Sequence, residues 1–203
     1  MSKNIIERLE ARFSKLPSQC SPDQPLFDAA GREYLVRYSL LPTSLDGKKG
    51  AIASNLPDFK PNKEYLEEFQ ARDLSSIGES AKIRKIALKF DPTRMLVASG
   101  DPTLGAPIVW KDHRTNKFFV LAGNGRTIAF LLASETRYKE YVKEATQRWF
   151  NVYTEEKRDG YRTLLVREVF HKDGSPLSVE EAIKLAGSSQ ESTAGKETPL
   201  RQA

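Results

Sequence analysis

The residues best suited to chemistry lie in the stretch FFVLAGNGRTIAFLLAS, residues 118–134. An apolar run from Phe118 to Ala122 stops at Gly123, and an apolar, helix-like stretch begins at Ile128. The glycines between them allow a tight turn and a close approach of the backbone to a ligand. The free N–H groups and the dipole of a helix that starts there favour a negative charge. The order strand, glycine loop, helix therefore predicts an anion-binding site.

Two side chains in the glycine loop suit a phosphate group. Arg126 carries a planar, permanently charged guanidinium that can form paired hydrogen bonds to phosphate. Thr127 offers a hydroxyl that can cap the helix, or bond a phosphate or a metal-bound water. The alternative is a plain strand-to-helix turn, in which the glycines only solve a backbone problem, because short glycine motifs often occur without a ligand.

Length, charge and cysteine content restrict the class of protein. The chain has 203 residues and a net charge of +5, which suits one domain, or one domain and an appendage, and permits a nucleotide or nucleic-acid partner. Cys20 is the only cysteine, and there are two histidines, so we expect no internal disulfide and no metal centre. No apolar run approaches the roughly 20 residues of a membrane helix, so we expect a cytoplasmic protein without membrane contact.

Hydrophobic spacing predicts the elements that position the loop. Strands are expected over 34–40, 95–98, 106–110, 118–122 and 162–169, with 109–122 forming a hairpin. Helices are expected over 3–16, 76–90, 128–133, 137–150 and 178–186. Segments 17–31 and 42–63, which are rich in proline and glycine, are expected to be loops.

Three local signals fix helix ends in this scheme. Glu79 follows Ser76 by three residues, and Glu181 follows Ser178 by three, which is the spacing of a capping box. Ser75 is an alternative first cap. Asp91-Pro92 is expected to stop the helix that begins near Ser76.

Several boxes, taken in order, resemble one superfamily. Gly123–Ala129 is similar to the G-E-R-R-x-x-A box of ParB-type domains, and closer to the S-G-N-G-R-x-x-A version of DdrB-like ParB domains of phages and mobile elements. Gln70–Asp73 resembles an earlier Q-x-R-D box, and Gly105–Val109 resembles a G-A-P-I-V strand. Gln190–Thr193 resembles the third box, N-x-S-T in these relatives, and 198–203 resembles the segment after it.

The resemblance implies a fold, a domain plan and a ligand. The fold would be α/β (α+β), a ParB/sulfiredoxin-like small mixed sheet flanked by helices. Residues 1–32 would be an N-terminal helix and linker, 33–187 the ParB-like domain, and 188–203 the third-box segment that starts a further helical region. Chromosome-partition members bind CTP between these boxes, so the resemblance implies a nucleoside triphosphate, with Mg²⁺ as an ion to test.

The matched positions give the residues that would hold this nucleotide. The glycine loop would hold the phosphates through Gly123, Asn124, Gly125, Arg126 and Thr127. From the other two boxes, Gln70 and Arg72 would lie beside the nucleotide, and Ser192 and Thr193 would close over it.

Two departures from the family pattern bear on catalysis. Asn124 stands where ParB-type boxes have glutamate, and a neutral amide cannot act as a general base and is a weaker Mg²⁺ ligand. Gln190 and Thr193 replace the asparagine and arginine of true ParB proteins, so closure over a triphosphate would lose a charge. Sulfiredoxin chemistry is set aside because its loop cysteine is Asn124 here.

Three functions therefore stay open at this point. The first is a nucleotide-binding switch or DNA-associated module of a phage or mobile element. The second is an enzyme, a ParB-type nuclease or NTP-dependent phosphotransferase, with Asp73, Glu79 and Asp91 as candidate acids that also have plain helix-end or surface explanations. The third is a DNA-binding module without nucleotide chemistry, which would use basic residues over 137–148, although glutamates interleave with them.

Overall fold

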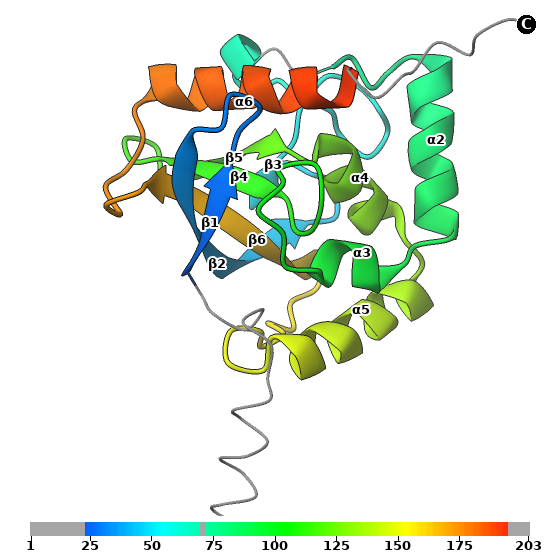
Figure 1. Cartoon of the computed structure of the whole chain (residues 1–203). Coiled ribbons are helices and arrows are strands. Elements are labelled where there is room, and N and C mark those ends of the chain that lie inside the picture. The colour runs from blue at the N-terminus through cyan, green and yellow to red at the C-terminus, as the bar shows by residue number, and fades with distance from the viewer. Residues whose placement is uncertain (1–22, 70–71, 195–203) are drawn as a thin grey trace, which may run out of the picture.

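A six-stranded mixed sheet forms the centre of the computed structural model, which describes residues 23–69 and 72–194 (Figure 1). The strand order across the sheet is β1 (Asp23–Phe27), β2 (Glu33–Ser44), β6 (Tyr161–His171), β4 (Ile108–Asp112), β5 (Lys117–Ala122) and β3 (Ala51–Ile52). Neighbouring strands pair antiparallel except at two places, β6 with β4 and β5 with β3, where the pairing is parallel.

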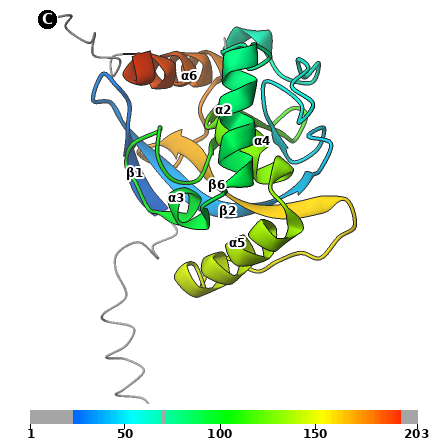
Figure 2. The same ribbon diagram turned by 90° about the vertical axis from the view of Figure 1, so that its right-hand side faces the viewer.

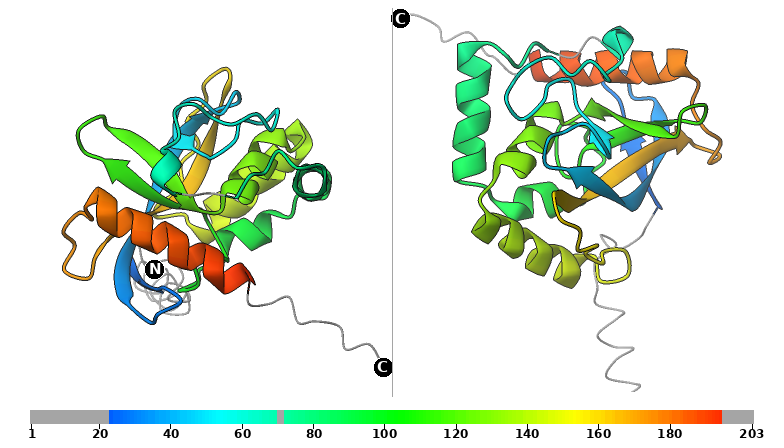
Figure 3. Two further views of the ribbon diagram at one scale, coloured as in Figure 1. Left: turned by 90° about the horizontal axis from the view of Figure 1, so that it is seen from above. Right: turned by 180° about the vertical axis from the view of Figure 1, so that it is seen from behind.

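Helices cover both faces of the sheet (Figures 1 and 3). Because side chains alternate along a strand, Ile108 and Trp110 of β4 pack in the apolar cluster of one helix, whereas Val109 packs in the cluster of the others. The first cluster belongs to α6 (Val179–Ala194). The second belongs to α2 (Ile77–Leu88), α3 (Pro92–Leu96), α4 (Asn124–Leu132) and α5 (Glu135–Arg148).

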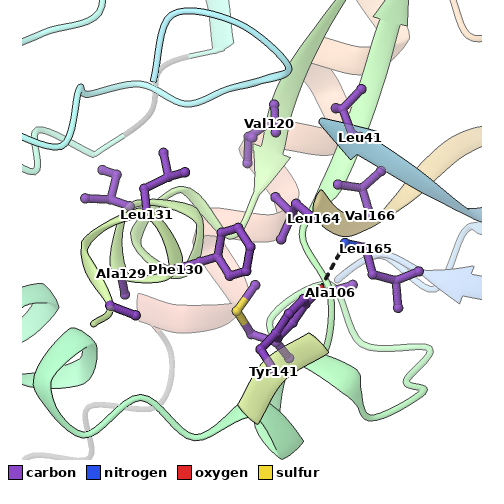
Figure 4. Close-up of a cluster of buried hydrophobic side chains, with 14 of the residues drawn as sticks. Leu41, Ala106, Val120, Ala129, Phe130, Leu131, Tyr141, Leu164, Leu165 and Val166 are labelled. Atoms are coloured by element: carbon purple, nitrogen blue, oxygen red, sulfur yellow. Dashed lines mark hydrogen bonds between the residues drawn. The ribbon is translucent and has the colours of Figure 1, made fainter. Parts of the chain in front are cut away.

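Aromatic packing fixes α4 on the sheet (Figure 4). The Phe130 ring of α4 meets the Tyr141 ring of α5 edge to face, with 4.9 Å between centroids. The Leu165 N–H of β6 donates to the Tyr141 hydroxyl at 2.9 Å, so α5 is bonded to the sheet as well as packed on it. Both rings are fully buried. The body of α4 is therefore held rigidly, and its N-terminus has a fixed position.

Most of the predicted elements are confirmed, with shifted ends. The hairpin forms as β4 and β5, the helix after the glycine loop is α4, and the expected strand 162–169 is β6. Ser76 caps α2, accepting from the Glu79 N–H at 3.4 Å. Helix α6 continues to Ala194, beyond the expected end at Ala186. The segment expected as a loop over 42–63 contributes the end of β2 and the short β3.

Two expectations are wrong. The strand expected over 95–98 does not form: its first two residues end the helix α3, which starts earlier because Asp91 caps it, accepting from the Thr93 N–H, and Pro92 fits the first helical turn. The loop expected over 17–31 contains β1, which pairs with β2 at the edge of the sheet, where a proline is tolerated. The helix expected over 3–16, the segment 198–203 and the side chain of Gln190 lie outside the described residues.

Candidate anion-binding site

The first backbone amides of α4 have no hydrogen-bond partner among the described residues. Gly123, the residue before the helix, has φ of 98°, a left-handed conformation that glycine adopts without strain. Thr127 is the first residue whose N–H meets a carbonyl, that of Gly123 at 2.9 Å. No side chain of the described residues caps the helix at Gly123. The amides of Asn124, Gly125 and Arg126 are therefore open to a ligand.

A pocket of about 370 Å³ opens at these amides, within the size range of small-molecule sites. It lies between α2, the start of α4, residues 102–103 and Ser189 of α6, and Figure 2 shows α2 standing at the surface in front of α4. The charged groups on its wall are Arg72, Lys82, Arg126 and Glu79, and its apolar side is formed by Leu74, Ile83 and Ile86. The pocket thus joins a positively charged end to an apolar side.

Arg126 bends back over the glycine loop. A Cβ on Gly123 would lie only 2.8 Å from Nη2 of Arg126, so the absence of a side chain at 123 makes room for the guanidinium. The guanidinium donates to the Gly105 carbonyl at 2.7 Å and to the Pro102 carbonyl at 3.0 Å. Arg126 therefore holds the loop of residues 99–106 against α4, and Arg126 also lines the pocket.

A second arginine donates hydrogen bonds to carbonyls of the same loop. Arg167 of β6 is fully buried and donates to the carbonyls of Ala106 at 2.7 Å and Ser99 at 2.8 Å, and also to Leu104 O. Burial lowers the pKa of Arg126 to about 9, and repulsion from Arg167 adds to the shift while Asp101 opposes it. Burial also lowers the pKa of Arg167 to about 10. Both groups are charged at neutral pH, and the region is electropositive.

Asn124 ties two distant segments to α4. Its Oδ1 accepts from the Ser54 N–H at 2.8 Å, and its Nδ2 donates to the Tyr65 hydroxyl at 3.5 Å. The Tyr65 hydroxyl donates to the Val120 carbonyl at 2.7 Å, and burial raises the pKa of Tyr65 to about 12. The Asn124 side chain is thus engaged within the protein, and only its backbone amide is open to the pocket.

The other positions predicted from the sequence fall in different places. Gly125 borders the pocket, where a Cβ would meet Ile83 at 3.5 Å, an ordinary contact distance. Arg72 is exposed and lines the pocket. Thr127 does not line it: the side chain is fully buried, and its hydroxyl donates to the Gly123 carbonyl at 3.0 Å. The structure therefore gathers Arg72 and the loop 123–126, and it places Thr127 in the core.

Three predicted residues lie beyond this description. Gln70 lies outside the described residues, and so do the side chains of Ser192 and Thr193 at the end of α6. Ser189, which precedes them on the same helix, lines the pocket. The helix that carries the third box therefore reaches the site.

The candidate acids differ in their relation to the pocket. Asp73 accepts from the Ser75 N–H in a turn at 2.9 Å, and Asp91 caps α3. Glu79 lines the pocket and pairs with Lys82 at 2.9 Å. Among the described residues, no group of three or more histidine, cysteine, aspartate or glutamate side chains is placed to hold a metal ion.

Three contributors to the site have no signal in the glycine motif itself. Tyr65 and Arg167 act through contacts to residues more than 50 positions away. Lys82 had a detectable signal, because it follows Glu79 by three residues on a predicted helix. Of this pair, only the glutamate is among the candidate residues predicted from the sequence.

Comparison with known proteins gives one match. A family model described as the ddrB-like ParB superfamily domain matches residues 52–170, which include α2, the hairpin, the glycine loop and α4. Neither the curated proteins nor the solved structures contain a significant match. Within the part of the chain that the structure describes, every helix is too short or too polar to cross a membrane.

Proposed function

The chain belongs to the ddrB-like ParB superfamily, and from this premise we propose that the pocket at the start of α4 binds a nucleoside triphosphate through its phosphates. One observation carries the proposal. The open amides of Gly125 and Arg126 and the Arg126 guanidinium border a pocket of nucleotide-compatible size. Backbone amides, a helix dipole and a cation together favour an oxyanion at this point.

The pocket wall on α2 supplies two further features. Lys82 adds a positive charge opposite α4, and the exposed Arg72 adds another. Leu74, Ile83 and Ile86 offer apolar surface, which suits the flat face of a base. We propose that the phosphates lie at the start of α4 and the base lies against α2. Titration with nucleotides of different bases measures the base preference, including a preference for CTP.

We propose binding without rapid turnover. Asn124 occupies the position of the family glutamate, and its side chain is held by Ser54 and Tyr65. It offers no carboxylate to activate a water molecule. We further propose that the bound nucleotide acts through α6, which reaches the pocket at Ser189, and that the domain serves as a switch or DNA-associated module of a phage or mobile element.

Isothermal titration with each of the four nucleoside triphosphates, with and without Mg²⁺, tests the proposal. We expect binding of at least one of them with a Kd of roughly 1 μM to 1 mM. Gly125→Ala should weaken that binding by about tenfold or more, because the new methyl group would occupy space in the pocket beside Ile83. The fold should tolerate this methyl group, because it would meet Ile83 at an ordinary contact distance.

The matched control is Gly78→Ala on α2, where an added Cβ meets nothing within 4 Å. Both variants gain helix propensity, but only the first changes the pocket. The absence of heat with all four nucleotides, for a protein shown to be folded by circular dichroism, would overturn the proposal. Equal affinities for the two variants would mean that the ligand does not bind at the start of α4.

A further inference from the structure

One side of α2 carries a row of lysines. Lys82 and Lys85 lie on α2 and Lys89 is its C-cap residue, and their spacings of three and four residues place them on one side of the helix. All three are exposed. Helix α2 buries only Ile83 and Ala87, and it stands at the surface of the molecule (Figure 2). The row, called the lysine row below, therefore faces solvent.

The lysine row begins at the pocket. Lys82 lines the pocket together with Ile83 and Ile86, whereas Lys85 lies farther along α2 and Lys89 follows at its C-cap, away from the N-terminus of the helix. At 1.5 Å per residue, the row is about 10 Å long. This is roughly the axial length of three nucleotides of one strand, at about 3.4 Å each. A phosphodiester chain that leaves the pocket along α2 would therefore place about three phosphates beside the three lysines of the row.

The positive charge on α2 is cancelled less completely than that on α5, because α2 carries three basic residues and one acidic residue, whereas α5 carries four and three. On α5, Arg137 pairs with Glu140 at 2.9 Å, and Arg148 pairs with Glu144 at 3.2 Å. On α2, Glu79 is the only acidic residue, and it pairs with Lys82. The positive surface next to the pocket therefore belongs to α2 and not to the longer basic segment on α5.

We propose that the ligand of this site is the end of a single nucleic-acid strand, with its terminal nucleotide in the pocket and its backbone along the lysine row. The placement of the terminal nucleotide rests on the proposed function. The path along Lys85 and Lys89 rests on their position beyond the pocket and on their charge. Lysine contacts to phosphate release counterions, so the affinity for such a strand depends strongly on salt.

Fluorescence anisotropy with a 3′-labelled, 5′-phosphorylated single strand of about six nucleotides tests this proposal on the full chain. The double variant Lys85→Ala/Lys89→Ala should weaken strand binding by roughly tenfold or more at about 0.1 M salt. It should lower the slope of log K against log salt by about 1.4, since each lost single-strand contact removes about 0.7. Binding of a free nucleoside triphosphate, measured by calorimetry, should stay within about twofold.

The matched control is Lys139→Ala/Lys143→Ala, which removes the same charge from exposed positions on α5. The affinities of this variant for the strand and for the free nucleotide should stay within about twofold of those of the unchanged protein. If the strand binds no better than the free nucleotide, or if both double variants bind it equally, the lysine row has no such role, while the proposed function still stands. If polyglutamate displaces the strand at equal charge concentration, the row is a general polyanion surface and the proposal is overturned. Failure of both ligands to bind removes both proposals.

Discussion

Gly123 shows how one residue shapes the site. Its backbone has φ of 98°, and the Arg126 guanidinium occupies the space where a side chain would be. That guanidinium holds the carbonyls of Pro102 and Gly105. The glycine therefore matters twice, once for its conformation and once for the room it leaves. The same arrangement gives the motif a structural role that does not depend on any ligand.

A substitution at this position separates the two effects. Gly123→Ala should lower the free energy of unfolding by roughly 2–4 kcal/mol, because left-handed strain adds to a clash with the Arg126 guanidinium. Gly160→Ala is the control: Gly160 has φ of 74°, and a Cβ there meets nothing within 4 Å, so only about 1–2 kcal/mol should be lost. Urea unfolding measures both. Equal losses would mean that Arg126 does not need the space above Gly123.

At the scale of elements, α4 connects the segments that surround the pocket. Asn124 bonds Ser54, two residues after β3, and the segment before α2, while Arg126 bonds the loop before β4. Its apolar face packs in the core between α5 and the strands (Figure 4). A helix that is bonded to several neighbouring segments and packed against the core keeps its open amides in a fixed direction, and this preorganisation favours anion binding.

The sequence predicted those parts of the fold that depend on local signals. The Ser76 cap, the reciprocal capping box of Ser178 and Glu181, the hairpin and the strand–glycine–helix order follow from spacing within a few residues, and the structure contains them. It failed at α3, where Asp91 and Pro92 start a helix as well as follow one. It also failed at β1, whose pairing with β2 is a tertiary contact.

The sequence predicted the candidate site only in part, for a similar reason. The Asn124 contacts span 70 and 59 positions, and those of Arg126 span 21 and 24. No local pattern reveals such distant partners. The motif therefore predicted which residues lie near the pocket, but not which groups their side chains bond. Thr127 illustrates this, since residue type alone could not tell a ligand-binding hydroxyl from one bonded within its own helix.

The capping box of α6 leads to a prediction about pH. The Ser178 N–H donates to Glu181 Oε2 at 2.8 Å, and the Glu181 N–H donates to Ser178 Oγ at 3.3 Å. The Ser178 N–H is the largest cause of a lowered pKa at Glu181, whose ordinary value is 4.5. The stabilisation by ionised Glu181 is therefore present above about pH 4.5 and is lost as the pH falls through the lower, folded-state pKa.

Glu181→Gln should accordingly be less stable than the unchanged protein at pH 7 and equally stable in acid below the folded-state pKa. Ser178→Ala should cost about 1 kcal/mol at pH 7, because α6 loses its cap. Urea unfolding at pH 7 and in acid provides the comparison. A constant difference between Glu181→Gln and the unchanged protein across this range would show that the charge is unimportant.

At the scale of the whole molecule, the sheet separates two apolar clusters, and the pocket lies where elements from both meet. Ser189 comes from α6 on one side, and Ile83 and Gly125 come from α2 and α4 on the other. Positive charge lies next to the pocket, from Arg126 and the fully buried Arg167, which both bond the 99–106 loop, to the lysine row on α2. The family match covers α2 and the loop but not α6, which begins after residue 170.

The most direct test of the central claim is a nuclear magnetic resonance titration of the ¹⁵N-labelled protein with a nucleoside triphosphate. The account predicts that the backbone amides of Gly125 and Arg126 show the largest and saturable shifts, with smaller shifts along α2, because these amides are open at the pocket. Gly160, which does not line the pocket, should not shift. Saturable binding that leaves the amides of Gly125 and Arg126 unchanged would contradict the account.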